Sequence, residues 1–465
     1  MTPAARLLAA IEIMEEADAD PRPVDRVLEG YFRQRRYAGS KDRHAVRNRV
    51  YGLLRRRSRV DWHLGRTGVS EHPTARMRVL ADLVLVDELT KAAITELFSG
   101  ENHAPYVMDE LELTLLSKLK GQILNSAPDM PAAVRLETPD WVYRRLEPVL
   151  GDEREAALAA MGTEAPFDLR INPLHKADRD SVREALYKQD IECTPTPLSP
   201  FGLRSAERKP IDSLKLFKEG LIEVQDEGAQ IAALLLGTAP GMQVADYCAG
   251  AGGKSLVIGG LMENKGRVLA LDTSEGRLER CGVRTRRAGL HNIERHVLAE
   301  GSDRRVKRLA GKFDRVMVDA PCSGTGTWRR NPDARWRYNE TDLAELNALQ
   351  AVILQRAARL VKPGGRLAYV TCSLLPEENE GIVNAFLEAR EGEFQALDIA
   401  TVWAETVAPL GGGACPVEGN ALRLYPHKHG TDGFFVQILE RRAAEETAEE
   451  TGEKDPGISS RRFSV

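Results

Sequence analysis

The sequence predicts an α/β protein in which a mostly parallel sheet, ending in an antiparallel hairpin, follows an all-helical region and a small α+β module. Three observations support this fold class. Apolar residues recur at helical spacing over 1–150, short strand-like runs occupy 165–228, and strand-like and helical runs alternate over 229–440. A chain of 465 residues is also too long for one core, so we expect about three domains.

The amino-terminal region is expected to be a helical bundle, because apolar residues such as Leu7, Leu8 and Ile11 share one helix face. The stretch from Arg33 to Arg59 holds eleven Lys or Arg and one acid, on a chain whose net charge is only −4. This basic stretch can be a solvated helix face or a surface that contacts phosphate. We give the two interpretations equal weight, because so many positive charges in one stretch repel one another unless an anionic partner binds there.

The small module is predicted from four strand-like runs with a helix between the first two: FDLRIN, IECTPT, GLRS and LIEVQ. In the following region, strand-like runs alternate with helical ones, and the strand-like runs are MQVADYC, GRVLALD, NIERHVL, FDRVMVDA and GGRLAYVTC. That alternation is typical of a parallel sheet covered by helices on both faces. ALRLYP and GFFVQIL are too close together for another crossover helix and predict an antiparallel pair. Residues 443–465 are expected to be a disordered acidic tail.

Composition narrows the class of protein. Hydrophobic residues at 42% and charged residues at 29% are typical of a globular protein and argue against wholesale disorder. The longest uncharged stretch, 228–245, is broken by polar residues and Pro, and the first residues lack a secretory pattern, so we expect a cytoplasmic protein without membrane helices. Six scattered cysteines without a Cys-x-x-Cys predict free thiols and no metal site.

A glycine-rich loop, DYCAGAGGKS at 246–255, follows an apolar strand and opens a helix, so its backbone is expected to approach a ligand closely. A Walker loop would need glycine where Cys248 stands, and a dinucleotide GxGxxG would need glycine where Ser255 stands. Asp272 ends the next strand, where a carboxylate can accept hydrogen bonds from two ribose hydroxyls. The loop therefore favours a nucleoside cofactor without phosphates over a tight turn that binds nothing.

Two cysteines also follow predicted strands, Cys322 in DAPCSGTG and Cys372 in TCS. Both should emerge at the carboxyl edge of the sheet, where open α/β folds bind ligands. A single free cysteine is usually buried and inert, but two cysteines at adjacent strand ends beside an acid are predicted to take part in a reaction. Cys193, Cys281 and Cys415 lack that setting and are expected to be structural.

These motifs, with VQDEGAQ, LDTSEGRLER and TCSLLPEENE, resemble the S-adenosylmethionine-dependent RNA cytosine-C5 methyltransferases of the NOL1/NOP2/Sun family over about 165–440. The segment SKDRHAVRNRVYGLLRR resembles, more loosely, the NusB-type domain of the bacterial RsmB/Sun (Fmu) type of ribosomal RNA methyltransferase. LRINPL through IEVQDEGAQ is similar to its RRM-like module. The resemblance implies a NusB-like RNA-binding domain at 1–150, an RRM-like module at 165–228 and a Rossmann-like methyltransferase domain at 229–440. The implied substrate is RNA, first of all small-subunit (16S) ribosomal RNA, either naked or in an assembling subunit.

The resemblance also implies roles for residues at the matching positions. Cys372 would be the nucleophile that adds to C6 of cytosine, and Cys322 would assist release of the methylated product. Asp319 would contact the base at N3 and the exocyclic amine, and the methyl-donor site. Glu300 stands where the family commonly has Asp, and Asp303 competes with it. The implied cofactor-binding residues are Cys248, Ala249, Gly250, Ala251, Gly252, Gly253, Lys254, Asp272, Glu300 and Asp319.

The predicted RNA contacts come from two segments. Trp328–Arg337 mixes four arginines with two tryptophans, which suits phosphate contact and stacking on an unpaired base. We predict contacts from Arg329, Arg330 and Arg335, with Trp336 equally a core residue. Arg170 and Asn172 of the small module are further predicted RNA contacts.

Three other functions remain open. The substrate can instead be transfer RNA or, less in keeping with the placement of Cys372, DNA. A ribosome-assembly or antitermination-like RNA-binding protein with a catalytically silent sheet is a second alternative, against which the intact Cys372, Cys322, Asp319 and Asp272 argue. A nicotinamide oxidoreductase, suggested by the strand, glycine loop and acid, comes last, and turnover of reduced nicotinamide would reveal it.

Overall fold

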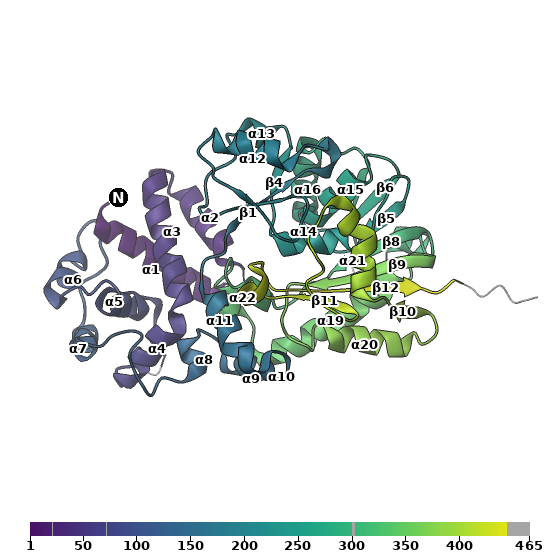
Figure 1. The fold of residues 1–465 in the computed structure, drawn as a ribbon. Helices are drawn as coiled ribbons and strands as arrows, with labels where there is room; N and C mark the ends of the chain where they lie inside the picture. Colours follow the sequence, from purple (N-terminus) through teal and green to yellow (C-terminus); the bar gives the residue numbers. More distant parts are fainter. Residues whose placement is uncertain (21, 71, 300–302, 444–465) are drawn as a thin grey trace, which may run out of the picture.

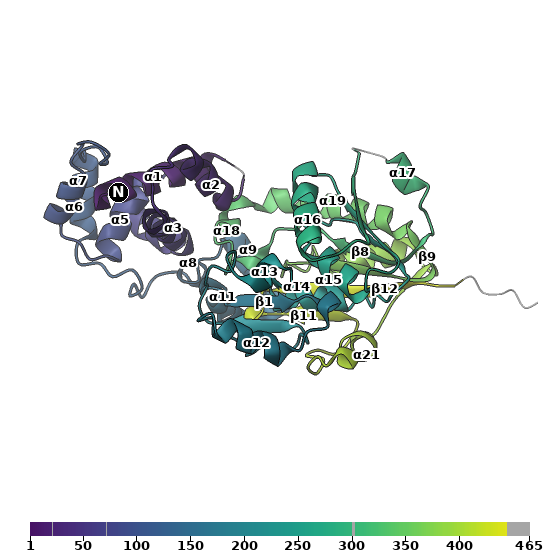
Figure 2. The ribbon, with the colours of Figure 1, turned by 90° about the horizontal axis from the view of Figure 1, so that it is seen from above.

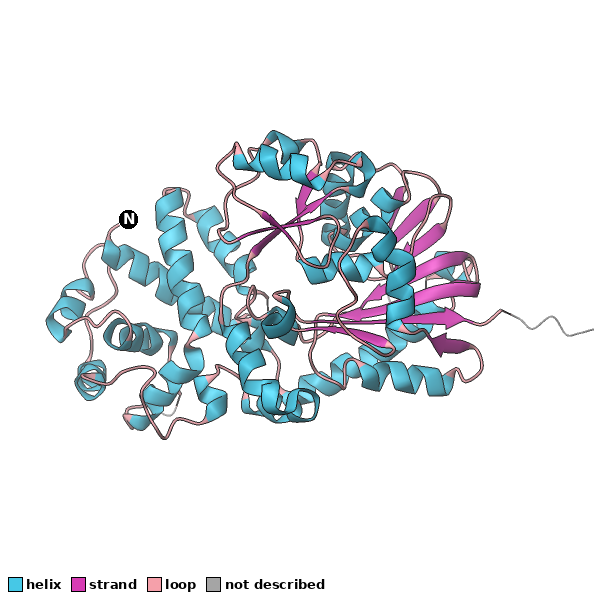
Figure 3. Cartoon of the chain, viewed as in Figure 1, coloured by secondary structure: helices cyan, strands magenta, loops and turns pink. Residues whose placement is uncertain are grey.

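A computed structural model describes residues 1–20, 22–70, 72–299 and 303–443 of the chain. The helical region lies at one end of the molecule and the large sheet at the other (Figures 1 and 2). A second, smaller sheet lies beside the large one (Figure 3). No helix within the described ranges is long and apolar enough to cross a membrane. Glu300 and the predicted tail from 444 onward lie outside the described residues.

The amino-terminal region is helical, as predicted. Its first helix, α1 (Pro3–Ala19), begins where the Thr2 hydroxyl accepts a hydrogen bond from the Ala5 amide at 3.1 Å, with proline in the first turn. Leu7, Ile11 and Met14 of α1 are buried in a shared core with the helices that follow. Those helices are α2 (Val24–Gln34), α3 (Ser40–Arg55), α4 (Arg57–Arg66), α5 (Ala75–Leu85), α6 (Lys91–Leu97), α7 (Glu110–Leu119), α8 (Ala132–Arg135), α9 (Asp140–Arg145), α10 (Glu147–Leu150), the 3-10 turn η1 (Gly151–Glu153) and α11 (Arg154–Gly162).

The small sheet contains one strand from each of the four predicted runs, and all its pairs are antiparallel in the order β2-β3-β1-β4. Alternate residues of one inner strand, such as Leu169 and Ile171, point to the same face of this sheet. There they pack against apolar residues of the helices and loops of the module. The elements are β1 (Phe167–Ile171), η2 (Pro173–His175), α12 (Arg179–Tyr187), β2 (Thr194–Pro195), β3 (Gly202–Ser205), α13 (Lys215–Lys218) and β4 (Ile222–Val224).

The large sheet has eight strands, in the order β10-β12-β9-β8-β5-β6-β7 with β11 paired to β12. The five predicted parallel strands pair in parallel, and the two late runs pair antiparallel, as predicted. The strands are β5 (Gln243–Asp246), β6 (Arg267–Asp272), β7 (Ile293–Val297), β8 (Phe313–Asp319), β9 (Val361–Thr371), β10 (Phe394–Ala396), β11 (Ala421–Leu424) and β12 (Phe434–Arg441).

Two apolar cores lie on the two faces of this sheet. Val244, Met317 and Val370 face one core, which α14 (Glu227–Leu234), α15 (Gly253–Leu261) and α21 (Ile399–Thr406) cover. The alternate strand residues face the second core, which α19 (Glu340–Ala358) and α20 (Glu380–Ala389) cover. Burial on both faces explains why these strands are continuous apolar runs. The remaining elements are α16 (Glu275–Arg287), α17 (Arg304–Lys307), η3 (Thr325–Thr327), α18 (Ala334–Arg337), η4 (Ala408–Leu410) and α22 (Pro426–His429).

Candidate active site

The strand order reverses beside β5, since β6 pairs with one side of it and β8 with the other. Such a reversal opens a crevice at the carboxyl ends of the strands, because the following crossovers lead to opposite faces of the sheet. The glycine-rich loop leaves β5 there, and Asp272 ends β6. Cys322 follows β8, and Cys372 follows β9, which is the neighbour of β8. The topology thus brings the predicted site segments to one edge.

The glycine-rich loop is held by the acid at the end of β6. The Asp272 carboxylate accepts hydrogen bonds from the Gly250 amide at 2.9 Å and the Ser274 amide at 2.7 Å. Gly252 has φ +82°, and a Cβ on it would lie 2.5 Å from the Cys281 sulfur, so a side chain has neither the conformation nor the space it needs. The loop backbone is therefore preorganised before any ligand binds.

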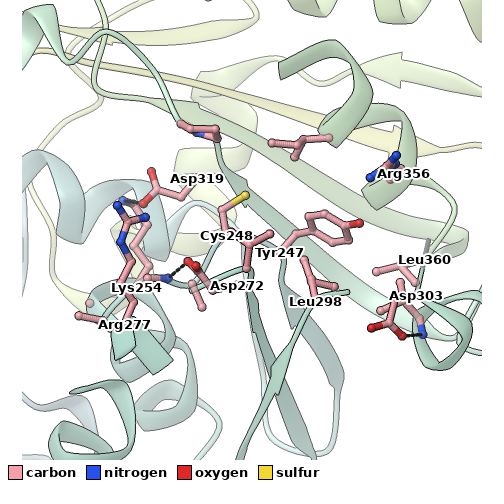
Figure 4. A pocket seen from close by; sticks show the side chains of 18 of the residues that line it. Tyr247, Cys248, Lys254, Asp272, Arg277, Leu298, Asp303, Asp319, Arg356 and Leu360 are labelled. Carbon is pink, nitrogen blue, oxygen red and sulfur yellow. Dashed lines mark hydrogen bonds and ion pairs between the residues drawn. The ribbon is translucent and has the colours of Figure 1, made fainter. Parts of the chain in front are cut away.

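A cavity of about 1330 Å³ opens in front of this loop. Cys248, Lys254, Asp272 and Asp319 point toward it, together with apolar walls that include Tyr247 and Leu298 (Figure 4). Most predicted cofactor residues line it: Cys248, Ala249, Gly250, Ala251, Gly253, Lys254, Asp272 and Asp319. Gly252 instead packs against Cys281. The acid at one strand end suits the polar ribose of a nucleoside, and the apolar wall suits its base.

Asp303, the competitor of Glu300, also lines the cavity. Its carboxylate caps α17 and accepts hydrogen bonds from the Val306 amide and from His296. Burial acts to raise the pKa of Asp303, but these hydrogen bonds outweigh it and hold the pKa at about 2. Asp303 is therefore an ionised acceptor at the end of the cavity away from Asp319 (Figure 4).

Lys254 and Asp319 form an ion pair that the local sequence pattern does not predict. The Lys254 Nζ lies 2.6 Å from the Asp319 Oδ2, and the lysine side chain is 10% exposed. Burial acts to lower the pKa of Lys254, but the charge of Asp319 outweighs it, so the pKa of Lys254 is raised. The oxygens of Asp319 are therefore held next to a cation, and they can accept hydrogen bonds.

The two thiols lie side by side, with 3.4 Å between the sulfurs of Cys322 and Cys372. Both side chains are partly exposed, and Pro321, which precedes Cys322, lines the cavity. The hydrogen bond with Cys372, together with burial, raises the pKa of the Cys322 thiol well above its ordinary value. The two thiols are therefore close enough to share one proton.

The predicted RNA contacts in Trp328–Arg337 need correction. Arg329 is buried and donates to the Gly430 and Thr431 carbonyls, and Arg335 is buried and donates to the Met161 carbonyl. Arg330 is ion-paired with Asp226 and Asp432. Each of the three side chains bonds to a distant segment of the chain, and burial removes Arg329 and Arg335 from the surface that a phosphate could reach.

The same segment joins the helical region to the large sheet. The Trp336 indole donates to the Leu54 carbonyl at 3.2 Å and packs against the amino-terminal core, and the Val24 amide donates to Asp333 at 3.1 Å. Arg55 donates to the Arg329 carbonyl at 3.1 Å. The arginine and tryptophan side chains of this segment therefore help to connect the helical region with the large sheet.

Arg170 and Asn172 also need correction as RNA contacts. Both are buried, with exposed fractions of 2% and 3%. The Asn172 amide donates to the Gly220 and Ala288 carbonyls at 3.0 Å, which ties the small sheet to the end of α16. Burial lowers the pKa of Arg170 to about 10. Neither residue reaches the surface.

The basic stretch from Arg33 to Arg59 is partly neutralised within the protein. Arg49 and Arg56 pair with Asp82, and Arg59 pairs with Glu137. Among the described residues, four exposed cations of the stretch make no ion pair: Arg33, Arg36, Lys41 and Arg47. These four lie on α2, α3 and the turn between them, and they form the remaining basic face.

Comparison with known proteins agrees with this geometry. Residues 233–440 match the family described as 16S rRNA methyltransferase RsmB/F, and residues 138–212 match the ferredoxin-like domain of RsmF/B-like methyltransferases. A probable ribosomal RNA small subunit methyltransferase B from Synechocystis sp. is 31% identical over 436 residues, which cover 90% of this chain and 94% of that protein. The crystal structure of PH0851 is similar over 95% of this chain and 99% of its own, with 26% identity and a TM-score of 0.76. A methyltransferase homologue from Pyrococcus horikoshii is similar over 68% of this chain and 99% of its own, with 29% identity and a TM-score of 0.56.

Proposed function

This chain belongs to the RsmB/F family of 16S rRNA methyltransferases, and on that premise we propose that it methylates C5 of a cytosine in RNA, first of all in 16S ribosomal RNA. The methyl donor is S-adenosylmethionine. One observation carries the proposal: two partly exposed thiols lie 3.4 Å apart, and the loop that carries Cys322 begins with Asp319 and Pro321, which line a cavity that suits a nucleoside. This combination fits covalent activation of a base next to a bound methyl donor.

The cofactor is proposed to occupy the cavity in front of the glycine-rich loop. Asp272 would accept hydrogen bonds from the ribose hydroxyls, with the orientation of its carboxylate set by the Gly250 and Ser274 amides. The wall of Tyr247 and Leu298 would receive the adenine ring. When bound, the cofactor supplies an electrophilic methyl group. The part played by Glu300 stays a prediction.

Cys372 is the proposed nucleophile. C5 of cytosine reacts poorly with an alkylating agent, and addition of a thiolate at C6 makes C5 enamine-like. The thiolate needs access to the base, and the Cys372 side chain is partly exposed at the carboxyl edge of the sheet. A target cytosine must be unstacked first, because its C6 cannot be reached within a helix.

Asp319 and Lys254 are proposed to hold the other side of the base. Asp319, ion-paired with Lys254, can accept a hydrogen bond from the exocyclic amine of cytosine, and Lys254 can donate one toward N3. The hydrogen bond donated to N3 draws electron density away from C6 and favours thiolate addition, and the one accepted from the amine orients the base. The division of labour differs from the sequence-based prediction, in which Asp319 alone served as the acid.

Cys322 is proposed to act when the product leaves. After methyl transfer the C5 proton must be removed so that the bond between Cys372 and C6 can break. Cys322 lies next to Cys372 and, once deprotonated, is a strong base because its thiol pKa is raised. Its loss should leave the RNA covalently bound.

The basic face of Arg33, Arg36, Lys41 and Arg47 is the proposed contact for the RNA backbone. Each phosphate that such a face neutralises releases a counterion, so the affinity should fall with salt. Removal of two of these cations should reduce the salt dependence by about two units of the logarithmic slope.

The test compares wild type, Cys372→Ala and Cys322→Ala on naked 16S RNA, on small-subunit particles and on transfer RNA, with labelled S-adenosylmethionine. We expect 5-methylcytosine from wild type, none from Cys372→Ala, and a complex that survives denaturing electrophoresis from Cys322→Ala alone. Cys415→Ala is the matched control, because this partly exposed thiol donates to the Val417 carbonyl and lies outside the two cysteine loops of the site. Full activity of Cys372→Ala would overturn the proposed mechanism, and label in transfer RNA alone would overturn the substrate.

A further inference from the structure

A buried carboxylate lies beside the two cysteine loops and is not one of the groups that contact the base in the proposed mechanism. Glu378 has an exposed fraction of 0% and lies between β9 and α20. Within the described parts of the chain it has no lysine, arginine or histidine at ion-pair distance. Burial of an unpaired carboxylate is costly, so its retention calls for compensating hydrogen bonds.

The carboxylate receives four hydrogen bonds. Its Oε1 accepts from the Ser323 amide at 2.8 Å and from the Gln350 side chain at 3.0 Å. Its Oε2 accepts from the Ser323 hydroxyl at 2.5 Å and from the Ser373 hydroxyl. Four donors satisfy most of the acceptor capacity of the two carboxyl oxygens and so offset the cost of their burial.

The two serines connect Glu378 to both thiols. Ser323 directly follows Cys322, and Ser373 directly follows Cys372. One side chain therefore joins the loop after β8 to the loop after β9. The Gly326 amide also donates to the Cys372 carbonyl at 2.9 Å, and the Leu374 amide donates to the Thr325 hydroxyl at 2.8 Å, so the two loops form one hydrogen-bonded unit.

The charge of Glu378 acts on the Cys322 thiol. The pKa of Cys322 is raised by the hydrogen bond with Cys372 first, then by burial, by the charge of Cys372 and by the charge of Glu378. Tyr338 and Tyr369 also lie near Cys322, and Lys254 lies near Cys372. Removal of the charge of Glu378 should therefore lower the pKa of Cys322.

We propose that Glu378 is a positioning residue that clasps the two cysteine loops at their working separation and places its negative charge next to them. Its carboxyl group receives hydrogen bonds from the serine that follows each cysteine, so one side chain holds both loops. The working separation refers to the proposed function, but the hydrogen bonds that hold the loops do not depend on it.

The first test is site-resolved alkylation of the free protein, without RNA or cofactor. Brief pulses of iodoacetamide at pH 6–11 are quantified by mass spectrometry for the peptides that contain Cys322 and Cys372. Glu378→Gln keeps the shape and removes the charge, so the midpoint for Cys322 should move to lower pH by about one unit. Glu388→Gln, an exposed position on α20, is the control and should leave the midpoint unchanged. A folded Glu378→Gln protein with the wild-type midpoint would overturn the proposal.

A second test covers the case in which Glu378→Gln does not fold. Diamide oxidises two neighbouring thiols to a disulfide and is itself reduced to the hydrazine, so its rate reports how often the two sulfurs meet. The double variant Ser323→Ala, Ser373→Ala removes two donors and only two oxygen atoms, and cross-linking of Cys322 to Cys372 should slow by about threefold or more. Cross-linking at the wild-type rate would show that the carboxylate does not hold the loops. Neither test needs methylation, so a failed proposal here is distinguishable from a failed proposed function.

Discussion

Asp319→Asn tests the ion pair at the centre of the site, because it removes the charge that faces Lys254 and keeps the shape of the side chain. The Lys254 side chain is 10% exposed and that of Asp319 is 34% exposed. A hydrogen bond to a charged group contributes about 1.5–3 kcal/mol, and a buried charge left without its partner costs about 3–5 kcal/mol. Since water screens the partly exposed Asp319, we expect a loss near the lower limit, about 2 kcal/mol.

The assay is thermal unfolding followed by near-ultraviolet circular dichroism. A loss of about 2 kcal/mol corresponds to a decrease of roughly 4–8 °C in melting temperature for a domain of this size. The matched control is Asp314→Asn on the same strand, whose partner Lys362 is 46% exposed, and it should cost less than about 1 kcal/mol. Equal decreases for the two variants would refute the reasoning.

The pH dependence gives the same test a second readout. Burial acts to lower the pKa of Lys254 and Asp319 raises it, with a net increase above the ordinary 10.5. A raised lysine pKa in the folded state stabilises the fold below the unfolded pKa, and this contribution is lost as the pH rises through the folded pKa. The difference between wild type and Asp319→Asn should therefore be largest near pH 7 and shrink as the pH rises toward 10.5 and beyond. A difference that grew with pH would contradict the pairing.

Three further predictions concern the glycine-rich loop and its neighbours. Gly252→Ala should destabilise the protein by about 2 kcal/mol in thermal unfolding, because of its positive φ and the contact with Cys281, whereas Gly276→Ala, with no atom within 4 Å of its Cβ, should be neutral or stabilising. Asp272→Ala should weaken S-adenosylmethionine binding about tenfold or more by calorimetry, since two hydrogen bonds to a charged group are lost, and unchanged affinity would remove it from the ribose site. Burial raises the pKa of Asp246 from 3.8 to about 7. The folded state therefore favours the neutral carboxyl group, and the contribution of this group to stability is present below pH 3.8 and is lost as the pH rises to 7. Asp246→Asn should lack this loss, and its melting temperature relative to wild type should rise from pH 4 to 8; a constant difference would contradict the assignment.

The fold class could be predicted because its signals are local. GRVLALD is an apolar run, and β6 occupies Arg267–Asp272 within it. The turn after β5 needs Gly252 at φ +82°, a conformation that side chains rarely adopt, so glycine marks it in the sequence. Neither inference depends on what lies far away in the chain.

The arginine segments could not be interpreted in this way. Arg330 pairs with Asp226 and Asp432, which lie more than a hundred positions away in sequence. A cluster of arginine and tryptophan has the same composition whether it contacts RNA or joins two domains. The basic stretch was ambiguous for a similar reason, because the acids that neutralise Arg56 and Arg59 belong to other segments.

By itself the sequence determined the order of helices and strands, the loop that suits a nucleoside, and the two strand ends that carry thiols, since hydrophobic periodicity and glycine conformations act over a few residues. Only the tertiary structure decided which charges meet. Lys254 and Asp319 are 65 positions apart, the two thiols are 50 apart, and Glu378 reads in the sequence as an ordinary acid near a helix start. Electrostatic and hydrogen-bond energies depend on distance in space and on burial, and both are set when distant segments pack together.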